Sequence, residues 1–71
     1  MKCMNDRLKN AIYSSSELAY QVTEIKKHSS SNNDFIRWMY DLILGEEHAV
    51  LNRFSQKDIE LIQWESLRSI I

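Results

Sequence analysis

Two short groups of side chains could hold a metal ion. Glu24 and His28 are four residues apart, which would place both ligands on one face of a helix. Glu46, Glu47 and His48 are consecutive and form the second group. Because the chain has 2 histidines and 1 cysteine, a complete site would have to join ligands from distant segments. We therefore predict no metal site and no cofactor, and we expect both histidines at the surface.

Residues that could catalyse a reaction lack their usual sequence surroundings. A nucleophile needs a base and donors for an oxyanion, and a glycine-rich turn commonly brings backbone N–H groups to that place. The chain has one glycine, Gly45, and contains neither a G-x-S-x-G nor an H-E-x-x-H motif. The single cysteine, Cys3, lies near the N-terminus, where a tuned thiolate is not expected. We predict no enzymatic activity and no catalytic residue.

DNA binding is another possible class of function, and the balance of basic and acidic residues argues against it. The chain carries 9 Lys+Arg and 10 Asp+Glu, a net charge of -1, whereas nucleic-acid binders usually show a basic excess. Residues 46–65 can nevertheless be aligned with a helix-turn-helix pattern, in which Arg53, Gln56 and Lys57 would reach the DNA. Glu60 in the same segment would repel phosphates. A dimeric helix-turn-helix transcriptional regulator is therefore the alternative prediction.

The elements that must position these residues are all predicted to be helices. Apolar residues recur at the three- and four-residue spacing of α-helices, and no segment alternates as a strand would. The run Ser-Ser-Ser-Asn-Asn at residues 29–33 is the predicted loop, because Ser and Asn side chains compete for backbone hydrogen bonds. We predict an all-α fold, a small bundle of three to four helices in a single domain over residues 1–71.

The helix boundaries follow from the apolar spacing and from capping residues. The predicted helices cover about residues 6–27, 34–44 and 56–70. Gly45 is predicted either to end the second helix as a left-handed cap or to kink a helix that continues to residue 53. Ser55 and Asp58 resemble a capping box and mark the start of the last helix.

The helix over 34–44 is apolar around about 240° of its circumference, against roughly 100° for an ordinary surface helix. A helix that is apolar on two sides needs two neighbours. In a chain with so few helices, we expect the second neighbour to be another copy, which gives a homodimer with a shared hydrophobic core. The residues predicted for this dimer or partner interface are Phe35, Trp38, Met39, Tyr40, Ile43 and Trp64.

A second partner surface is predicted on the first helix, opposite its apolar stripe. On a continuous helix the four residues concerned would fall within about 40° of one another. Tyrosine provides a large, rigid contact area at low entropic cost. The alternative is that these are ordinary solvated side chains, or tyrosines packed beneath another helix. The residues of this strip are Lys9, Tyr13, Tyr20 and Lys27.

These observations favour a small, non-enzymatic regulatory or adaptor protein that binds another protein through helical surfaces. A regulator, anti-activator, inhibitor, antitoxin-like factor or chaperone would each fit, and a structural assembly subunit is a third alternative. No run of 18 or more apolar residues is present, so we expect no membrane span. The free thiol and the lack of an apolar segment before it point to the cytoplasm.

Overall fold

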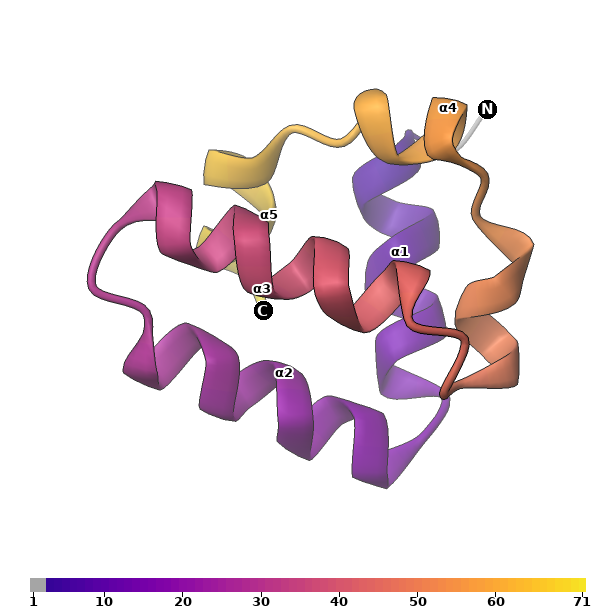
Figure 1. Cartoon of the computed structure of the whole chain (residues 1–71), viewed down its shortest axis with the longest axis horizontal. Coiled ribbons are helices and arrows are strands. Elements are labelled where there is room, and N and C mark those ends of the chain that lie inside the picture. Colours follow the sequence, from indigo (N-terminus) through magenta and orange to yellow (C-terminus); the bar gives the residue numbers. More distant parts are fainter. Residues whose placement is uncertain (1–2) are drawn as a thin grey trace.

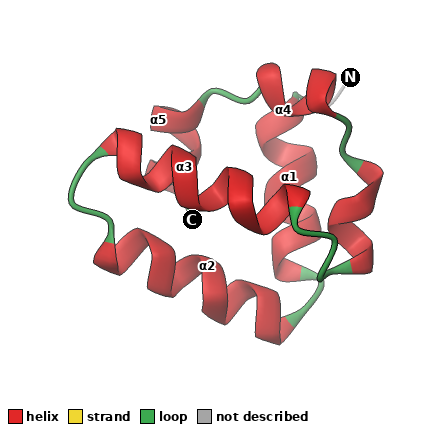
Figure 2. Ribbon diagram, in the orientation of Figure 1, coloured by secondary structure: helices red, strands yellow, loops and turns green. Residues whose placement is uncertain are grey.

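Residues 3–71 are described by the computed structural model, and they form five α-helices and one short 3₁₀ helix (Figures 1 and 2). The elements in chain order are α1 (Met4–Tyr13), α2 (Ser16–His28), α3 (Asn32–Leu44), η1 (Ala49–Arg53), α4 (Gln56–Glu60) and α5 (Trp64–Ile70). No strand occurs within these residues, so the all-α prediction is confirmed. None of the helices in the described part of the chain has the length and apolar character needed to cross a membrane.

The predicted helix over 6–27 is wrong, because the chain turns at Ser14 and Ser15 and forms two helices. Ser15 has extended backbone, and its Oγ accepts a hydrogen bond from the backbone N–H of Leu18 at 3.3 Å. The Ser14 hydroxyl donates to the carbonyl oxygen of Ala11 at 2.6 Å. Short hydroxyl side chains compete with helix continuation in this way, and here they end α1 and cap α2.

The helix predicted over 34–44 is present as α3 and starts slightly earlier than expected. Its N-cap is Ser31, whose Oγ accepts from the backbone N–H of Asp34 at 3.2 Å. The loop predicted over 29–33 is therefore shorter, because its two asparagines already belong to the helix.

Gly45 follows α3 without the predicted left-handed conformation. Its φ of -76° and ψ of -4° are right-handed, and the left-handed residue is Glu46 with a φ of 60°. A Cβ atom on residue 45 would lie 2.7 Å from the carbonyl oxygen of Asp41, so glycine is favoured there by close packing. The helix does not continue to residue 53; His48 is extended and η1 begins after it.

The predicted helix over 56–70 is also divided, into α4 and α5. The capping box at its start is confirmed, since Ser55 Oγ accepts from Asp58 N at 3.2 Å and Ser55 N donates to Asp58 Oδ2 at 3.1 Å. The break falls before Trp64 and coincides with two hydrogen bonds between the Asn5 side chain and the backbone of Gln63. The Asn5 Nδ2 donates to the carbonyl oxygen of Gln63 at 3.0 Å, and the Asn5 Oδ1 accepts from Gln63 N at 2.9 Å.

One continuous core lies between α1, α2, α3, η1 and α5, with Ile59 of α4 added to it, and α3 runs across its front in Figure 1. α3 contacts α2, η1 and α5 of the same chain. Trp64 of α5 meets Phe35 edge-on at 6.1 Å between ring centroids and packs on Tyr40 at 5.6 Å. The second neighbour that the sequence analysis assigned to another copy is therefore α5, and a second copy is not needed to bury α3.

Arg68 ties the C-terminal helix to the turn between α2 and α3. Its Nη1 donates to Asn32 Oδ1 at 2.8 Å, and its Nη2 donates to the carbonyl oxygen of Ser29 at 3.1 Å. Its guanidinium also stands 5.7 Å from the centroid of the Phe35 ring. Lys26 adds a hydrogen bond to the carbonyl oxygen of Ile71 at 2.7 Å. These contacts hold α5 against the core, so that one copy of the chain encloses it.

Candidate functional site

The interface predicted on α3 is mainly core. Phe35, Met39 and Ile43 are buried. Tyr40, like Trp64 of α5, is half-buried, and the two rings contact each other. Trp38 remains on the surface with 37% of its area exposed. The six predicted residues therefore do not form one free surface, and Trp38 is the member best placed to contact a partner.

The second predicted strip is not continuous, because it required a straight helix over 6–27. Lys9 and Tyr13 lie on α1, whereas Tyr20 and Lys27 lie on α2. Figure 1 shows that these two helices are joined by a turn and point in different directions rather than continuing in line. Tyr13 and Tyr20 are both exposed, the latter by 65% of its area. Tyr13 and Tyr20 are therefore exposed separately on α1 and α2, and the predicted strip is not formed.

The residues predicted to contact DNA are exposed, but the element that should carry them is not formed. Arg53 ends η1, while Gln56 and Lys57 lie in the first turn of α4. α4 ends at Glu60 after 5 residues, about one and a half turns. The recognition helix of the predicted helix-turn-helix is therefore missing.

The two histidines among the candidate metal ligands lie in separate contacts. His28 Nε2 lies 3.0 Å from Glu24 Oε2 on α2, as their spacing indicates. His48 Nε2 hydrogen-bonds Gln21 Oε1 at 2.7 Å. Among residues 3–71, no three His, Cys, Asp or Glu side chains come together as a metal site would require.

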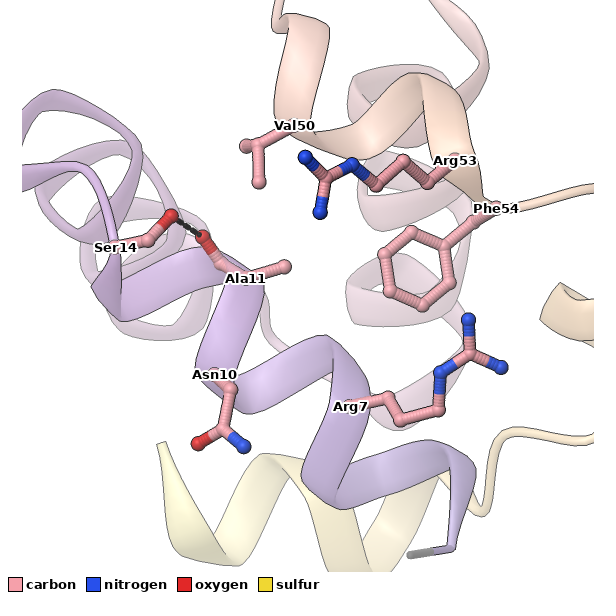
Figure 3. Close-up of a pocket in the computed structure, with 7 residues that line it drawn as sticks. All are labelled: Arg7, Asn10, Ala11, Ser14, Val50, Arg53 and Phe54. Carbon is pink, nitrogen blue, oxygen red and sulfur yellow. Dashed lines mark hydrogen bonds between the residues drawn. The ribbon is translucent and has the colours of Figure 1, made fainter.

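A groove between α1 and η1 is the feature that the sequence analysis missed. Its volume is about 310 Å³, and Figure 3 shows the side chains around it. In that view the Phe54 ring lies between the guanidinium groups of Arg7 and Arg53, and the Ala11 methyl group points into the space beside them. The lining residues are Arg7, Asn10, Ala11, Ser14, Val50, Arg53 and Phe54.

Helical spacing brings these residues to the groove. The spacing of four residues places Arg7 and Ala11 on one face of α1. Ser14 follows three residues later, at the C-terminal end of the same helix. Val50 and Arg53 are three apart, and side chains at that spacing are eclipsed in a 3₁₀ helix. The groove exists because the core brings α1 and η1 into contact. The spacing was visible in the sequence, but the contact between these two elements was not.

The charges of this groove are not paired with any carboxylate of residues 3–71. Arg7 stands over Phe54, with Cζ 5.5 Å from the ring centroid. No carboxylate of the described residues forms an ion pair with Arg7 or Arg53. The lining has no Asp, Glu, His or Cys that could serve as a general base for Ser14, whose hydroxyl donates to Ala11. The arrangement is therefore suited to binding an anionic group beside an apolar one.

The comparisons with known proteins assign no family. No family model matches the chain, and no curated protein and no solved structure matches it either. A functional proposal must therefore rest on the groove and on the side chains that the core leaves exposed.

Proposed function

We propose that the chain is a small, non-enzymatic regulatory or adaptor protein of the cytoplasm that acts by binding another protein. The exposure of Trp38 carries this proposal. Trp38 keeps 37% of its area exposed beside the core, and tryptophan is among the residue types that contribute most to protein interfaces. Tyr13 and Tyr20 on the neighbouring helices are exposed as well.

The proposal keeps the predicted homodimer but not its shared hydrophobic core. A shared core is not required, because α2 and α5 already cover α3 within one copy. Two copies would instead meet through surfaces that include Trp38. Such a contact would leave each copy folded when it dissociates, so that the same surface would be free for a different protein.

A substitution at Trp38 tests this proposal. Trp38→Ser removes the exposed ring, and Leu61→Ser is the matched control because Leu61 is exposed on a different part of the chain. Sedimentation velocity up to roughly 100 µM would detect self-association stronger than about -5.5 kcal/mol. We expect the wild type and Leu61→Ser to associate alike, and Trp38→Ser to remain monomeric.

Affinity capture from the native host extends the same comparison to other proteins. Wild-type and Leu61→Ser baits should retain a common partner that the Trp38→Ser bait loses. If the wild type is monomeric throughout the concentration range and all three baits capture the same proteins, the proposal is wrong.

A further inference from the structure

We infer that the groove between α1 and η1 binds an acidic segment of a partner protein. In this arrangement an apolar side chain of the segment enters the groove, and carboxylates on either side of it pair with Arg7 and Arg53. The inference rests on the proposed function in one respect, namely that the partner is a protein. Its evidence, however, is the groove and not Trp38.

Arg7 and Arg53 are exposed, whereas the half-buried Arg68 and Lys26 donate hydrogen bonds within the fold. Arg68 donates to Asn32 and Ser29, and Lys26 donates to the carbonyl oxygen of Ile71. Neither Arg7 nor Arg53 has an ion pair or a side-chain hydrogen bond within residues 3–71. Two cations that line one groove without a counter-charge favour an anionic occupant, and a guanidinium can bind a carboxylate through two parallel hydrogen bonds.

Arg7 is already held in a position to bind. Its guanidinium lies over the ring of Phe54, which is 8% exposed and belongs to the core. A side chain stacked on a fixed ring loses less conformational freedom when it binds than a freely moving one does. This stacking therefore lowers the entropic cost of pairing Arg7 with a carboxylate.

The apolar part of the lining selects among anions. Ala11, Val50 and Phe54 provide it, and the volume of about 310 Å³ lies at the small end of ligand sites. One aliphatic or aromatic side chain fits such a space, whereas a whole helix would not. An occupant that combines carboxylates with one apolar side chain uses both the cations and the apolar surface.

A nucleic acid uses this groove less well than an acidic peptide. Its phosphates could pair with the arginines, but a phosphate backbone would leave the apolar surface unfilled. The observations therefore favour a protein segment over DNA or RNA.

Selection from a display library of random short peptides against the full chain tests the inference. We expect the selected peptides to carry Asp or Glu on both sides of a Leu, Ile, Phe or Trp. Arg53→Gln should weaken a selected peptide roughly tenfold, as expected for loss of a charge-assisted pair. Lys57→Gln is the matched control, since Lys57 is an exposed cation on α4 outside the groove lining, and it should leave binding within about twofold.

The remaining outcomes separate this inference from its alternatives. Arg53 is exposed, so Arg53→Gln should unfold at the same urea concentration as the wild type, and a loss of binding then reports the groove. Selected peptides without an acidic bias, or equal binding by Arg53→Gln, would overturn the inference. Tighter, salt-sensitive binding of a mixed-sequence DNA duplex would replace the peptide by nucleic acid. Capture of a partner through Trp38 would leave the proposed function intact in each of these cases.

Discussion

At the scale of single residues, Asn5 makes the side-chain hydrogen bonds with the largest sequence separation of those described above. It is 7% exposed, and its amide group donates to and accepts from the backbone of Gln63, 58 positions along the chain. The pair satisfies one N–H and one C=O at the break between α4 and α5. An amide side chain does this well, because it offers a donor and an acceptor side by side, as the backbone of a neighbouring strand would.

Asn5→Ala tests this role. Removing the amide leaves the Gln63 N–H without its partner, whereas the Gln63 carbonyl oxygen still accepts from Leu67 N at 2.9 Å, so we expect a loss of roughly 1–2 kcal/mol in the free energy of unfolding. Asn10→Ala on the same helix is the control, since Asn10 is exposed, and it should cost less than about 0.5 kcal/mol. Urea unfolding followed by tryptophan fluorescence measures both values. Equal losses for the two variants would contradict the role given to Asn5.

The arginines show at the same scale why residue type alone does not identify a site. Both Arg68 and Arg53 lie near a phenylalanine. Arg68 stands over the ring of Phe35, and Arg53 directly precedes Phe54 in the sequence. Arg68 has its donors occupied by Asn32 and Ser29, and it stabilises the fold. Arg53 has no such partner within the described residues and is free to pair with a ligand. Only the surrounding contacts separate these two functions.

At the scale of elements, serine hydroxyls decide where three of the helices begin. Ser15, Ser31 and Ser55 each accept a hydrogen bond from a backbone N–H in the first turn of the helix that follows. Ser55 was recognised from the sequence because Asp58 completes a capping box three residues later. Ser15 was not, because the apolar spacing on both of its sides fits one continuous helix.

Ser15→Ala tests whether the break between α1 and α2 depends on this cap. Loss of an N-cap hydroxyl costs about 1 kcal/mol, and we expect that loss in the free energy of unfolding. Ser14→Ala is the matched control, because the Ser14 hydroxyl is exposed and donates to Ala11 without capping a helix start. Hydrogen exchange at the Leu18 amide should speed up in Ser15→Ala alone. An unchanged or increased stability of Ser15→Ala would mean that the continuous helix over 6–27 is the favoured state of this segment.

Elements that depend on residues close in the sequence could be predicted, whereas those that depend on contacts between distant residues could not. The helical class, α3 and the Ser55–Asp58 capping box depend on residues within one or two turns, and these predictions are confirmed. The break before Trp64 coincides with hydrogen bonds to Asn5, 58 positions away in the sequence, and a contact over that separation is not visible in a local pattern. The groove also requires that α1 and η1 meet. The sequence shows the spacing within each element but not their contact.

At the scale of the whole molecule, the number of helices changes the conclusion about assembly. Three long helices would leave one side of α3 uncovered, and a second copy would then have to share the core. The extra breaks produce shorter elements that fold back, so that α2 covers one flank of α3 and α5 brings Trp64 to the other. Contacts of Lys26 and Arg68 hold α5 in place. Folding of one copy therefore does not require a second copy.

The dependence of thermal stability on concentration distinguishes a self-contained core from a shared one. For an obligate dimer, each tenfold dilution removes about 1.4 kcal/mol of apparent stability. Because both chains of such a dimer unfold together, the unfolding entropy is that of two domains, and the loss corresponds to a fall of roughly 3–5 °C in Tm. We expect the Tm of Trp38→Ser to change by less than about 2 °C per tenfold dilution, because this variant lacks the proposed surface contact but retains every contact of the core. Leu67→Ala is the reference for damage to the core: Leu67 is fully buried, and its truncation should lower Tm equally at all concentrations. A fall of several degrees per tenfold dilution of Trp38→Ser would show that two copies share the core after all.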